Sequence, residues 1–366
     1  MRRPRLCLLL AVALALAAAS SARAQDKVVN VYNWSDYIDP AVLQQFTKET
    51  GIAVRYDVYD SLETLEGKLL AGHSGYDVIV PTAQPTLARL IRAHAVQALD
   101  KAKLPHFSGL DPDLLKRVAG ADPGNRYGAI YMWGSTGLGI DPTKLAKSAP
   151  GAPLDSWDLL FKPAWAKQAA SCGVIMMDSA IDVIPSVLHY LGKNPDSTDA
   201  GDLAAVEKTL MAIRPYIRTF ASGGAIEQMA SGEACLTLDY SGDVIQAQAR
   251  AAEAHRGVAL RYVAPREGAQ LSFDEMAIPA DAPHPDAALA FIDFILRPEV
   301  MAAITNKVRY PNAVPASDPM IAKDILDDPG IYPPQSVRAN FFETGSLPAA
   351  AQRAQSRMWA RFRAGH

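Results

Sequence analysis

Histidine, cysteine and serine are the side chains that most often carry catalysis or bind metals, and their spacing decides whether this chain could use them so. No two histidines stand four residues apart, as a pair of metal ligands on one helical face would. The chain has no H-E-x-x-H, no C-x-x-C and no P-loop. We therefore expect a protein that is not an enzyme, has no catalytic residue and uses no metal or cofactor. The histidines are His73, His94, His106, His189, His255, His284 and His366.

Two short motifs come near to known functional loops without matching them. The segment Gly72–Gly75 (GHSG) lacks the last glycine of G-x-S-x-G, so we interpret it as a helix end that leads into a strand. Gly134, Gly137 and Gly139 follow the spacing G-x-x-G-x-G, whereas a dinucleotide-binding loop needs G-x-G-x-x-G. A phosphate-binding loop is one interpretation of these glycines. We favour the other, a flexible crossover between two lobes.

The first 24 residues have the three parts of a secretory signal peptide. The basic stretch Arg2–Arg5 precedes the apolar run Leu6–Ala18, and Ala22–Ala24 (ARA) supplies the cleavage pattern. A membrane anchor is the alternative, but the apolar run is shorter than the roughly 20 residues that span a bilayer. We expect cleavage, with a mature chain that begins at Gln25.

Removal of the signal peptide changes the expected charge of the chain. Residues 1–24 hold four of the 36 Lys and Arg residues and none of the 39 Asp and Glu residues, so the mature chain carries a formal charge of about −7. A protein that binds nucleic acid usually relies on a basic face. We therefore expect no nucleic-acid partner.

Export also decides the interpretation of the cysteines. Cys7 leaves with the signal peptide, so only Cys172 and Cys235 remain. In an oxidising compartment two cysteines most economically form one disulfide. A disulfide between Cys172 and Cys235 would close a long loop and stabilise the fold by roughly 4 kcal/mol. Two buried thiols are the alternative.

Strand-like and helix-like segments alternate along the first part of the mature chain. Asp39 and Pro40 predict a helix start and Gly51 its end, and Asp60 with Glu63 predicts a capping box for the next helix. This alternation predicts an α/β fold with a parallel sheet that helices cover on both faces. The predicted strands are Val28–Asn33, Ile52–Tyr59 and Tyr76–Val80, and the predicted helices are residues 40–50, 60–72 and 86–94.

The second part continues the alternation, and the length of 366 residues favours two domains. Residues 340–366 predict a docking helix with one apolar stripe, formed by Ala350, Ala354, Met358 and Phe362. The other predicted elements are strands within 170–177, 232–238, 258–263 and 276–278 and helices over 183–191 and 285–296.

The segment Val31–Ile38 (VYNWSDYI) resembles the periplasmic polyamine-binding proteins of ABC importers, above all the putrescine receptors. Tyr76–Thr82 (YDVIVPT) and Tyr131–Gly137 (YMWGSTG) are similar to two further motifs of that family. The resemblance extends over nearly the whole mature chain. Four more matching segments follow in order: Cys172–Val174, Ser241–Val244, Ile278–Ala282 and Gly330–Pro334.

The resemblance implies a type II periplasmic binding protein, with two hinge-connected α/β lobes and the ligand cleft between them. It implies a monomer in the periplasm that delivers a polyamine to a membrane permease, with the ATPase of that permease as an indirect partner. Cys172 and Cys235 match a disulfide pair of the putrescine receptors. The implied division is 1–24 signal peptide, 25–133 and 255–308 lobe 1, 134–254 lobe 2, and 309–366 the return to lobe 2 with the C-terminal helix.

The family also implies where a diamine would bind. Asp274, with Ser35, Asp36 and Thr82, matches the group that holds one ammonium, and Asp182 with Asp243 matches the group that holds the other. Each aspartate could instead cap a helix, and each tyrosine could belong to a core. The aromatic walls match Trp34, Tyr240 and Tyr310, and Gln84 lies among the ligand positions.

Several positions depart from the family pattern. Ser272 replaces a large aromatic residue, Tyr240 replaces a tryptophan, and Asp182 is shorter than the expected glutamate. Gln84 stands where putrescine receptors have serine, and Asp239 is an additional acid that faces either the cleft or solvent. Ser179 takes the place of the carboxylate typical of spermidine receptors. We therefore favour putrescine or a similar diamine. A polyamine sensor, or the same fold with spermidine, agmatine or iron as its ligand, is the alternative.

Overall fold

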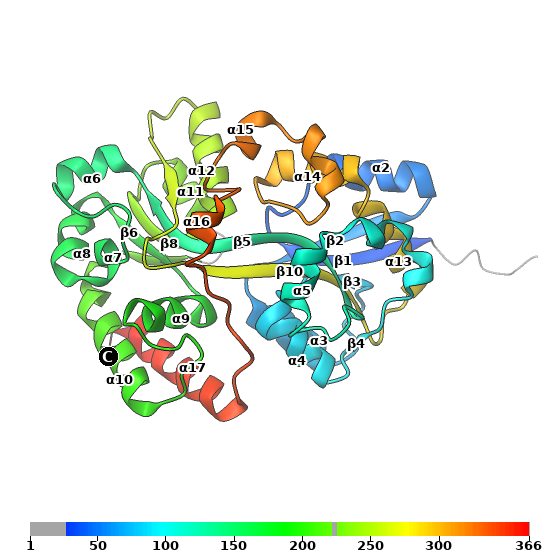
Figure 1. Cartoon of the computed structure of the whole chain (residues 1–366), viewed down its shortest axis with the longest axis horizontal. Coiled ribbons are helices and arrows are strands. Elements are labelled where there is room, and N and C mark those ends of the chain that lie inside the picture. Colours follow the sequence, from blue (N-terminus) through cyan, green and yellow to red (C-terminus); the bar gives the residue numbers. More distant parts are fainter. Residues whose placement is uncertain (1–26, 222–224, 366) are drawn as a thin grey trace, which may run out of the picture.

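The computed structural model describes residues 27–221 and 225–365, so the predicted signal peptide lies outside it. A mixed sheet runs through the described chain in the order β2-β1-β3-β10-β5-β8-β6-β7, while β4 pairs with β10 and β9 with β5 (Figure 1). The strands are β1 (Val28–Trp34), β2 (Ala53–Tyr59), β3 (Val78–Ile79), β4 (Val96–Gln97), β5 (Gly128–Ile140), β6 (Val174–Met177), β7 (Thr219–Ala221), β8 (Leu236–Tyr240), β9 (Arg261–Val263) and β10 (Gln270–Pro279).

The α/β prediction is confirmed, but the prediction of a parallel sheet is correct only for the outer strands. β1 pairs in parallel with β2 and β3, and β6 pairs in parallel with β7 and β8. The two long strands β5 and β10 run antiparallel to each other through the middle of the molecule (Figure 1). They connect two groups of strands, each covered by its own helices.

The glycines of β5 do not form the flexible crossover that the sequence predicts. Gly137 and Gly139 lie within a regular, fully buried strand. A β-carbon on Gly137 would lie 2.5 Å from the hydroxyl of Tyr262, and one on Gly139 would lie 2.6 Å from Thr237. Glycine is required there because neighbouring side chains press against the strand, and neither glycine has a positive φ.

Local capping signals place the first predicted helix correctly. The carboxylate of Asp39 accepts a hydrogen bond from Ala41 N–H at 2.9 Å, and Gly51 ends the same helix in the left-handed conformation. The predicted capping box is wrong by one residue, because Ser61 caps the second helix. The helices are α2 (Pro40–Thr50), α3 (Leu62–Leu70), α4 (Ala88–Arg92), α5 (Pro112–Val118), α6 (Pro142–Ser148), α7 (Asp158–Phe161), α8 (Pro163–Ala169), α9 (Ala180–Tyr190), α10 (Ala200–Ile213), α11 (Ala225–Ala230), α12 (Ser241–Glu253), α13 (Pro285–Ile295), α14 (Pro298–Val308), α15 (Lys323–Leu326), α16 (Gln335–Arg338) and α17 (Ala349–Ala364).

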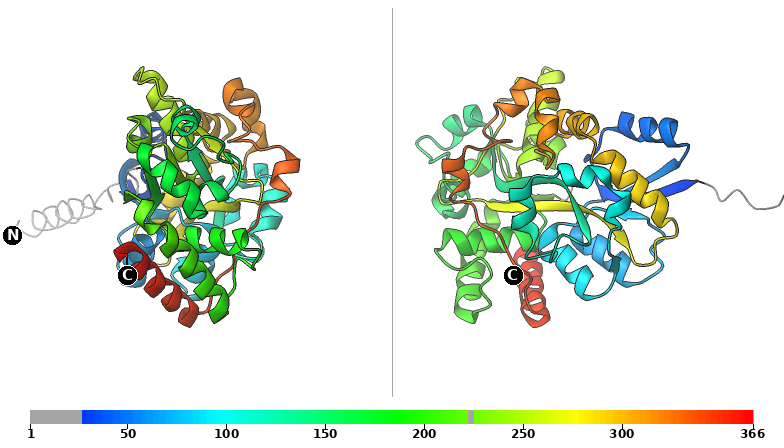
Figure 2. Two further views of the ribbon diagram at one scale, coloured as in Figure 1. Left: turned by 90° about the vertical axis from the view of Figure 1, so that its left-hand side faces the viewer. Right: turned by 45° about the vertical axis from the view of Figure 1, so that its right-hand side comes forward.

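Each end of the sheet has its own hydrophobic core. One core gathers β1, β3, α2, α13 and α14, and a separate core gathers β6, β8, α9 and α10. The C-terminal helix α17 packs against α9 and α10 (Figures 1 and 2). Met358 and Phe362 of its predicted stripe are buried, but Ala350 is exposed, and Trp359 and Gln355 complete the buried face instead. Among the described residues, no helix combines the length and the apolar character needed to cross a membrane.

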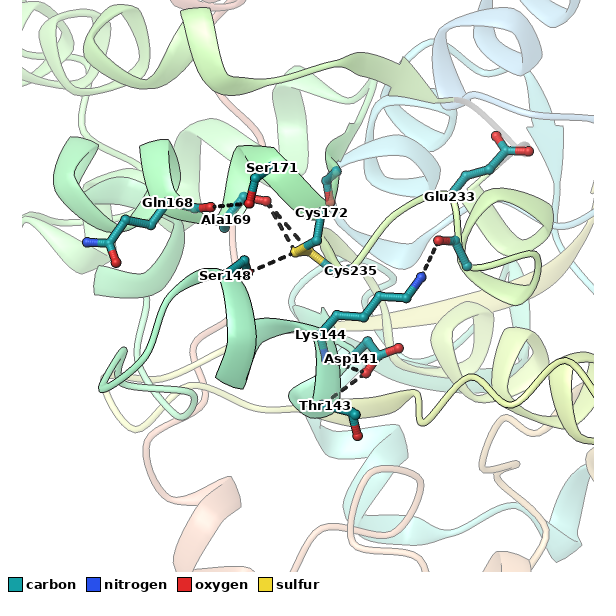
Figure 3. The surroundings of a disulfide bond; sticks show 12 residues. Asp141, Thr143, Lys144, Ser148, Gln168, Ala169, Ser171, Cys172, Glu233 and Cys235 are labelled. Carbon is teal, nitrogen blue, oxygen red and sulfur yellow. Dashed lines mark hydrogen bonds between the residues drawn. A yellow bond between two sulfur atoms is a disulfide. The ribbon is translucent and has the colours of Figure 1, made fainter.

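Cys172 and Cys235 form a disulfide, which confirms the predicted bridge and excludes two thiols (Figure 3). Cys172 ends a 3-10 turn (Ala170–Cys172) after α8, and Cys235 directly precedes β8. The bond therefore fastens a surface helix to a central strand of one lobe. It closes a loop with a sequence separation of 63 residues.

We expect the double substitution Cys172→Ala with Cys235→Ala to lower the free energy of unfolding by about 2–4 kcal/mol, because the unfolded chain regains the entropy of the open loop. Urea denaturation followed by tryptophan fluorescence measures the difference. The fully reduced wild type is the matched control and should lose a similar amount. An unchanged midpoint in both proteins would contradict a stabilising role for the bridge.

Glu275 on β10 is a buried carboxyl group whose lost hydration is not replaced by hydrogen bonds from the described residues. Its side chain is fully buried, and no donor among the described residues reaches either carboxyl oxygen. It packs against Gly128, where a β-carbon would have no room. Burial, together with the nearby carboxylates of Asp122 and Asp274, raises the pKa of Glu275 well above its usual value.

We expect Glu275→Met to stabilise the protein at pH 8 by about 1–4 kcal/mol, because an apolar side chain replaces a buried group without partners. A raised pKa means that the folded state holds the proton more tightly than the unfolded state. Wild-type stability therefore falls as the pH rises from the unfolded pKa toward the folded pKa. The gain should thus be smaller at pH 5 than at pH 8 in urea denaturation. An equal gain at both pH values would contradict the role of the charge.

Candidate ligand-binding site

A cavity of about 90 Å³ lies where the two lobes meet at the long strands β5 and β10. This volume is small beside the roughly 300–1,000 Å³ of pockets that hold drug-sized molecules. No lysine, arginine or histidine lines it among the described residues. A cavity with this lining suits a small cation. The acidic residues that line it are Asp60, Glu63, Asp178, Asp182, Asp239, Asp243 and Asp274.

The structure brings nine of the ten predicted ligand residues to this one cavity. Asp36 is the exception, because it lies exposed outside the lining with a positive φ of 54°. Its carboxylate accepts a hydrogen bond from Arg250 at 2.8 Å, and Arg250 also binds Glu227. Asp36 therefore ties the loop after β1 to α12 of the other lobe. The nine residues in the lining are Trp34, Ser35, Thr82, Gln84, Asp182, Tyr240, Asp243, Asp274 and Tyr310.

Asp274 lies where β10 passes from one lobe to the other. The register of β10 against β5 shifts between Asp274 and Glu275, and an isolated β-bridge joins Asp274 to Thr82. The carboxylate accepts hydrogen bonds from Tyr37 O–H at 2.8 Å and from Thr82 O–H at 2.9 Å. Burial raises the pKa of Asp274 to about 6, although both hydrogen bonds favour the charged form.

Asp182 lies in the first turn of α9 and reaches the cavity from the second lobe. Its carboxylate accepts hydrogen bonds from the hydroxyls of Ser179 and Tyr240, the latter at 2.8 Å, and from Gln270 Nε2 at 3.5 Å. Burial raises its pKa to about 6 against the effect of the hydroxyl donors. Ser179, which lacks the charge typical of spermidine receptors, here orients Asp182.

Asp243 and Asp239 come from the junction between β8 and α12. Asp243 accepts a hydrogen bond from Tyr310 O–H at 2.8 Å, and Asp239 accepts one from Tyr240 N–H at 2.9 Å. Burial raises the pKa of Asp243 to about 6 and, with the charge of Asp243, raises the pKa of Asp239 well above its usual value. Asp239 is only 4% exposed and lines the cavity, which answers the question that the sequence left open.

Aromatic rings close the cavity on several sides. Trp34 donates its indole N–H to Val80 O at 3.0 Å, and its ring lies 4.7 Å from Tyr59 and 6.4 Å from Tyr240. The rings of Tyr37 and Tyr310 meet edge to face at 4.9 Å. Sequence reasoning missed Tyr37 and Tyr59 as cavity residues. Tyr37 lies within the first matched motif, and Tyr59 ends the strand beside it, so their positions carried the signal.

Small side chains form one wall of the cavity. Ser272 pairs with Gly134 across the two long strands, and both residues line the cavity. Gln84 accepts a hydrogen bond from the hydroxyl of Ser346 at 2.9 Å, so the segment before α17 holds it in place.

The arrangement offers no center for metal chemistry in the described residues, where no three His, Cys, Asp or Glu side chains gather as metal ligands. Of the three tyrosines weighed as iron ligands, Tyr240 and Tyr310 line the cavity, whereas Tyr131 donates its hydroxyl to Tyr37 O at 2.6 Å inside the core.

Comparisons with known proteins agree with this geometry. Residues 41–333 match the family model described as bacterial extracellular solute-binding protein. The chain is 47% identical to the putrescine-binding periplasmic protein SpuD of Pseudomonas aeruginosa, over 98% of each chain. It is 44% identical to the putrescine-binding periplasmic protein PotF of Escherichia coli, over 98% of this chain and 97% of that one.

A solved structure shows the same fold. The putative spermidine/putrescine ABC transporter from Listeria monocytogenes superposes with a TM-score of 0.83 at 27% identity, over 92% of this chain and 98% of that one. The resemblance identified in the sequence is therefore confirmed, as is the two-lobe fold class.

Proposed function

Because the chain belongs to the bacterial extracellular solute-binding protein family, whose members bind solutes and are not enzymes, we propose that it captures a polyamine, putrescine or a similar diamine, for an ABC-type permease. The observation that carries the proposal is the cavity between the lobes, where Asp182, Asp243 and Asp274 converge and no basic side chain of the described residues lines the wall. A linear dication supplies the positive charges that this lining lacks.

The cavity matches both parts of a diamine. Asp274, with the hydroxyls of Tyr37 and Thr82 on its oxygens, is placed to hold one ammonium. Asp243 and Asp182 come from the other lobe and are placed to hold the second. The methylene chain would lie along the aromatic walls, whose faces also attract cations by about 0.5–2 kcal/mol. Because each lobe supplies one charged end, a diamine would favour the closed arrangement.

The same proposal covers location and partners. We infer that residues 1–24 direct the chain to the periplasm, where it acts as a monomer and meets the permease and, indirectly, its ATPase. We further propose lobe 1 as 25–133 with 255–308, and lobe 2 as 134–254 with 309–366. The curated relatives are named as periplasmic proteins, which supports this location.

We expect Asp243→Asn and Asp274→Asn each to weaken putrescine binding by about 3–5 kcal/mol, because each removes the partner of an enclosed ammonium. Calorimetric titration of the ligand-stripped mature protein measures the loss. Asp113→Asn is the matched control, since it makes the same change in an exposed ion pair with Lys116. Binding at wild-type strength by either cavity variant would overturn the site assignment.

The affinity should also depend on pH. The pKa values of Asp182, Asp243 and Asp274 are each about 6 in the ligand-free protein, whereas a bound dication favours their charged forms. Amine groups with a pKa near that of lysine, about 10.4, stay charged throughout this range. Lowering the pH from 7.5 to 5.5 should therefore weaken binding by about tenfold or more.

Titrations in buffers of different ionisation enthalpy would count the protons released on binding. Asp243→Asn should show a shallower pH dependence than the wild type, because one titrating group is gone. A dissociation constant that stays the same across this pH range would contradict the assigned role of the carboxylates.

A further inference from the structure

The carboxylates of the cavity differ in how many hydrogen bonds they accept from the protein. Asp182 and Asp274 accept hydrogen bonds from side chains on both of their oxygens. Asp239 and Asp243 each accept only one, from Tyr240 N–H and from Tyr310 O–H, and both of these bonds go to Oδ1. The Oδ2 atoms of Asp239 and Asp243 have no donor among the described residues. Both residues line the cavity.

These two carboxylates belong to one end of the cavity. Asp239 lies near the end of β8, and Asp243 lies in the first turn of α12, four residues later. The protein donor on each Oδ1 fixes the orientation of each group. The ring of Tyr310 packs directly on Gly242, where a β-carbon has no room, and this contact holds an aromatic wall beside the pair.

The same end of the cavity is lined by small residues. A β-carbon on Gly134 would lie 3.1 Å from the Tyr310 ring, so Gly134 and its strand partner Ser272 belong to this end. Neither residue extends a large side chain into the lining. Two acceptors, an aromatic wall and small lining residues therefore coincide.

We propose that Asp239 and Asp243 together bind a guanidinium group, so that the site prefers a guanidino-terminated amine such as agmatine to a simple diamine. This inference rests on the proposed function and specifies its ligand. A guanidinium is planar, presents five N–H donors and stacks on aromatic rings, whereas an ammonium is compact and presents three donors. A single ammonium needs only one of the two carboxylates and leaves the Oδ2 atom of the other without a donor among the described residues. Asp274 then holds the primary ammonium at the other end.

Calorimetric titration with agmatine and with putrescine tests the inference on the mature protein and on Asp239→Asn. We expect the wild type to bind agmatine about tenfold or more tightly than putrescine. Asp239→Asn should lose about tenfold in affinity for agmatine and less than about threefold for putrescine. Asp113→Asn is the matched control, because it removes one charge from an exposed ion pair with Lys116 outside the cavity lining. It should leave the ratio of the two affinities unchanged.

Ser272→Phe provides a second test that leaves all the acids in place. A large side chain there should weaken agmatine binding more than putrescine binding. Equal losses of the two ligands in Asp239→Asn, or a wild type that prefers putrescine, would overturn this inference and leave the proposed function standing. Failure of the wild type to bind either amine would instead overturn the proposed function itself.

Discussion

The constraint on which this structure depends is the enclosure of several carboxylates in a cavity that, in the part of the chain the structure describes, is lined by no basic side chain. An ionised carboxylate that loses its water must regain hydrogen bonds or a counter-charge, and otherwise it takes up a proton. Hydroxyl groups provide part of the compensation, from Tyr37 and Thr82 on Asp274 and from Tyr310 on Asp243. They are too few to keep the pKa values of these acids at their ordinary level. A ligand that carries positive charge would supply the remaining compensation and keep these acids in their charged form.

The fold assembles this cavity from positions where strands end or helices begin. Asp182 and Asp243 both lie in first helical turns, where the helix dipole favours a negative charge, and Asp274 lies where a long strand crosses between the lobes. The strands β5 and β10 connect the two groups of strands, so they join the parts of the chain that carry acids from different cores. A cation held between the lobes would contact acids from both cores and would favour the closed arrangement.

Local signals in the sequence predicted the structural features that depend only on neighbouring residues, such as helix ends and the order of strands and helices. The cap at Asp39, the end at Gly51 and the alternation of strands and helices need only short-range chemistry. The close packing around the β5 glycines comes from Tyr262 and Thr237, which are distant in sequence, so the glycine spacing alone did not predict a regular strand. Nine of the ten ligand residues predicted from the family resemblance line the cavity, but Asp36 instead pairs with Arg250 of the other lobe.

Asp274 and Glu275 show how one physical effect serves function at one residue and costs stability at the next. Both carboxyl groups have raised pKa values because burial removes their water. Asp274 has two donors and faces the cavity, so a cation can recover the energy of its burial. Glu275 packs against Gly128 without a donor among the described residues, and nothing that enters the cavity can compensate it there. Selectivity for a cation thus depends less on the number of acids than on which of them open onto the space between the lobes.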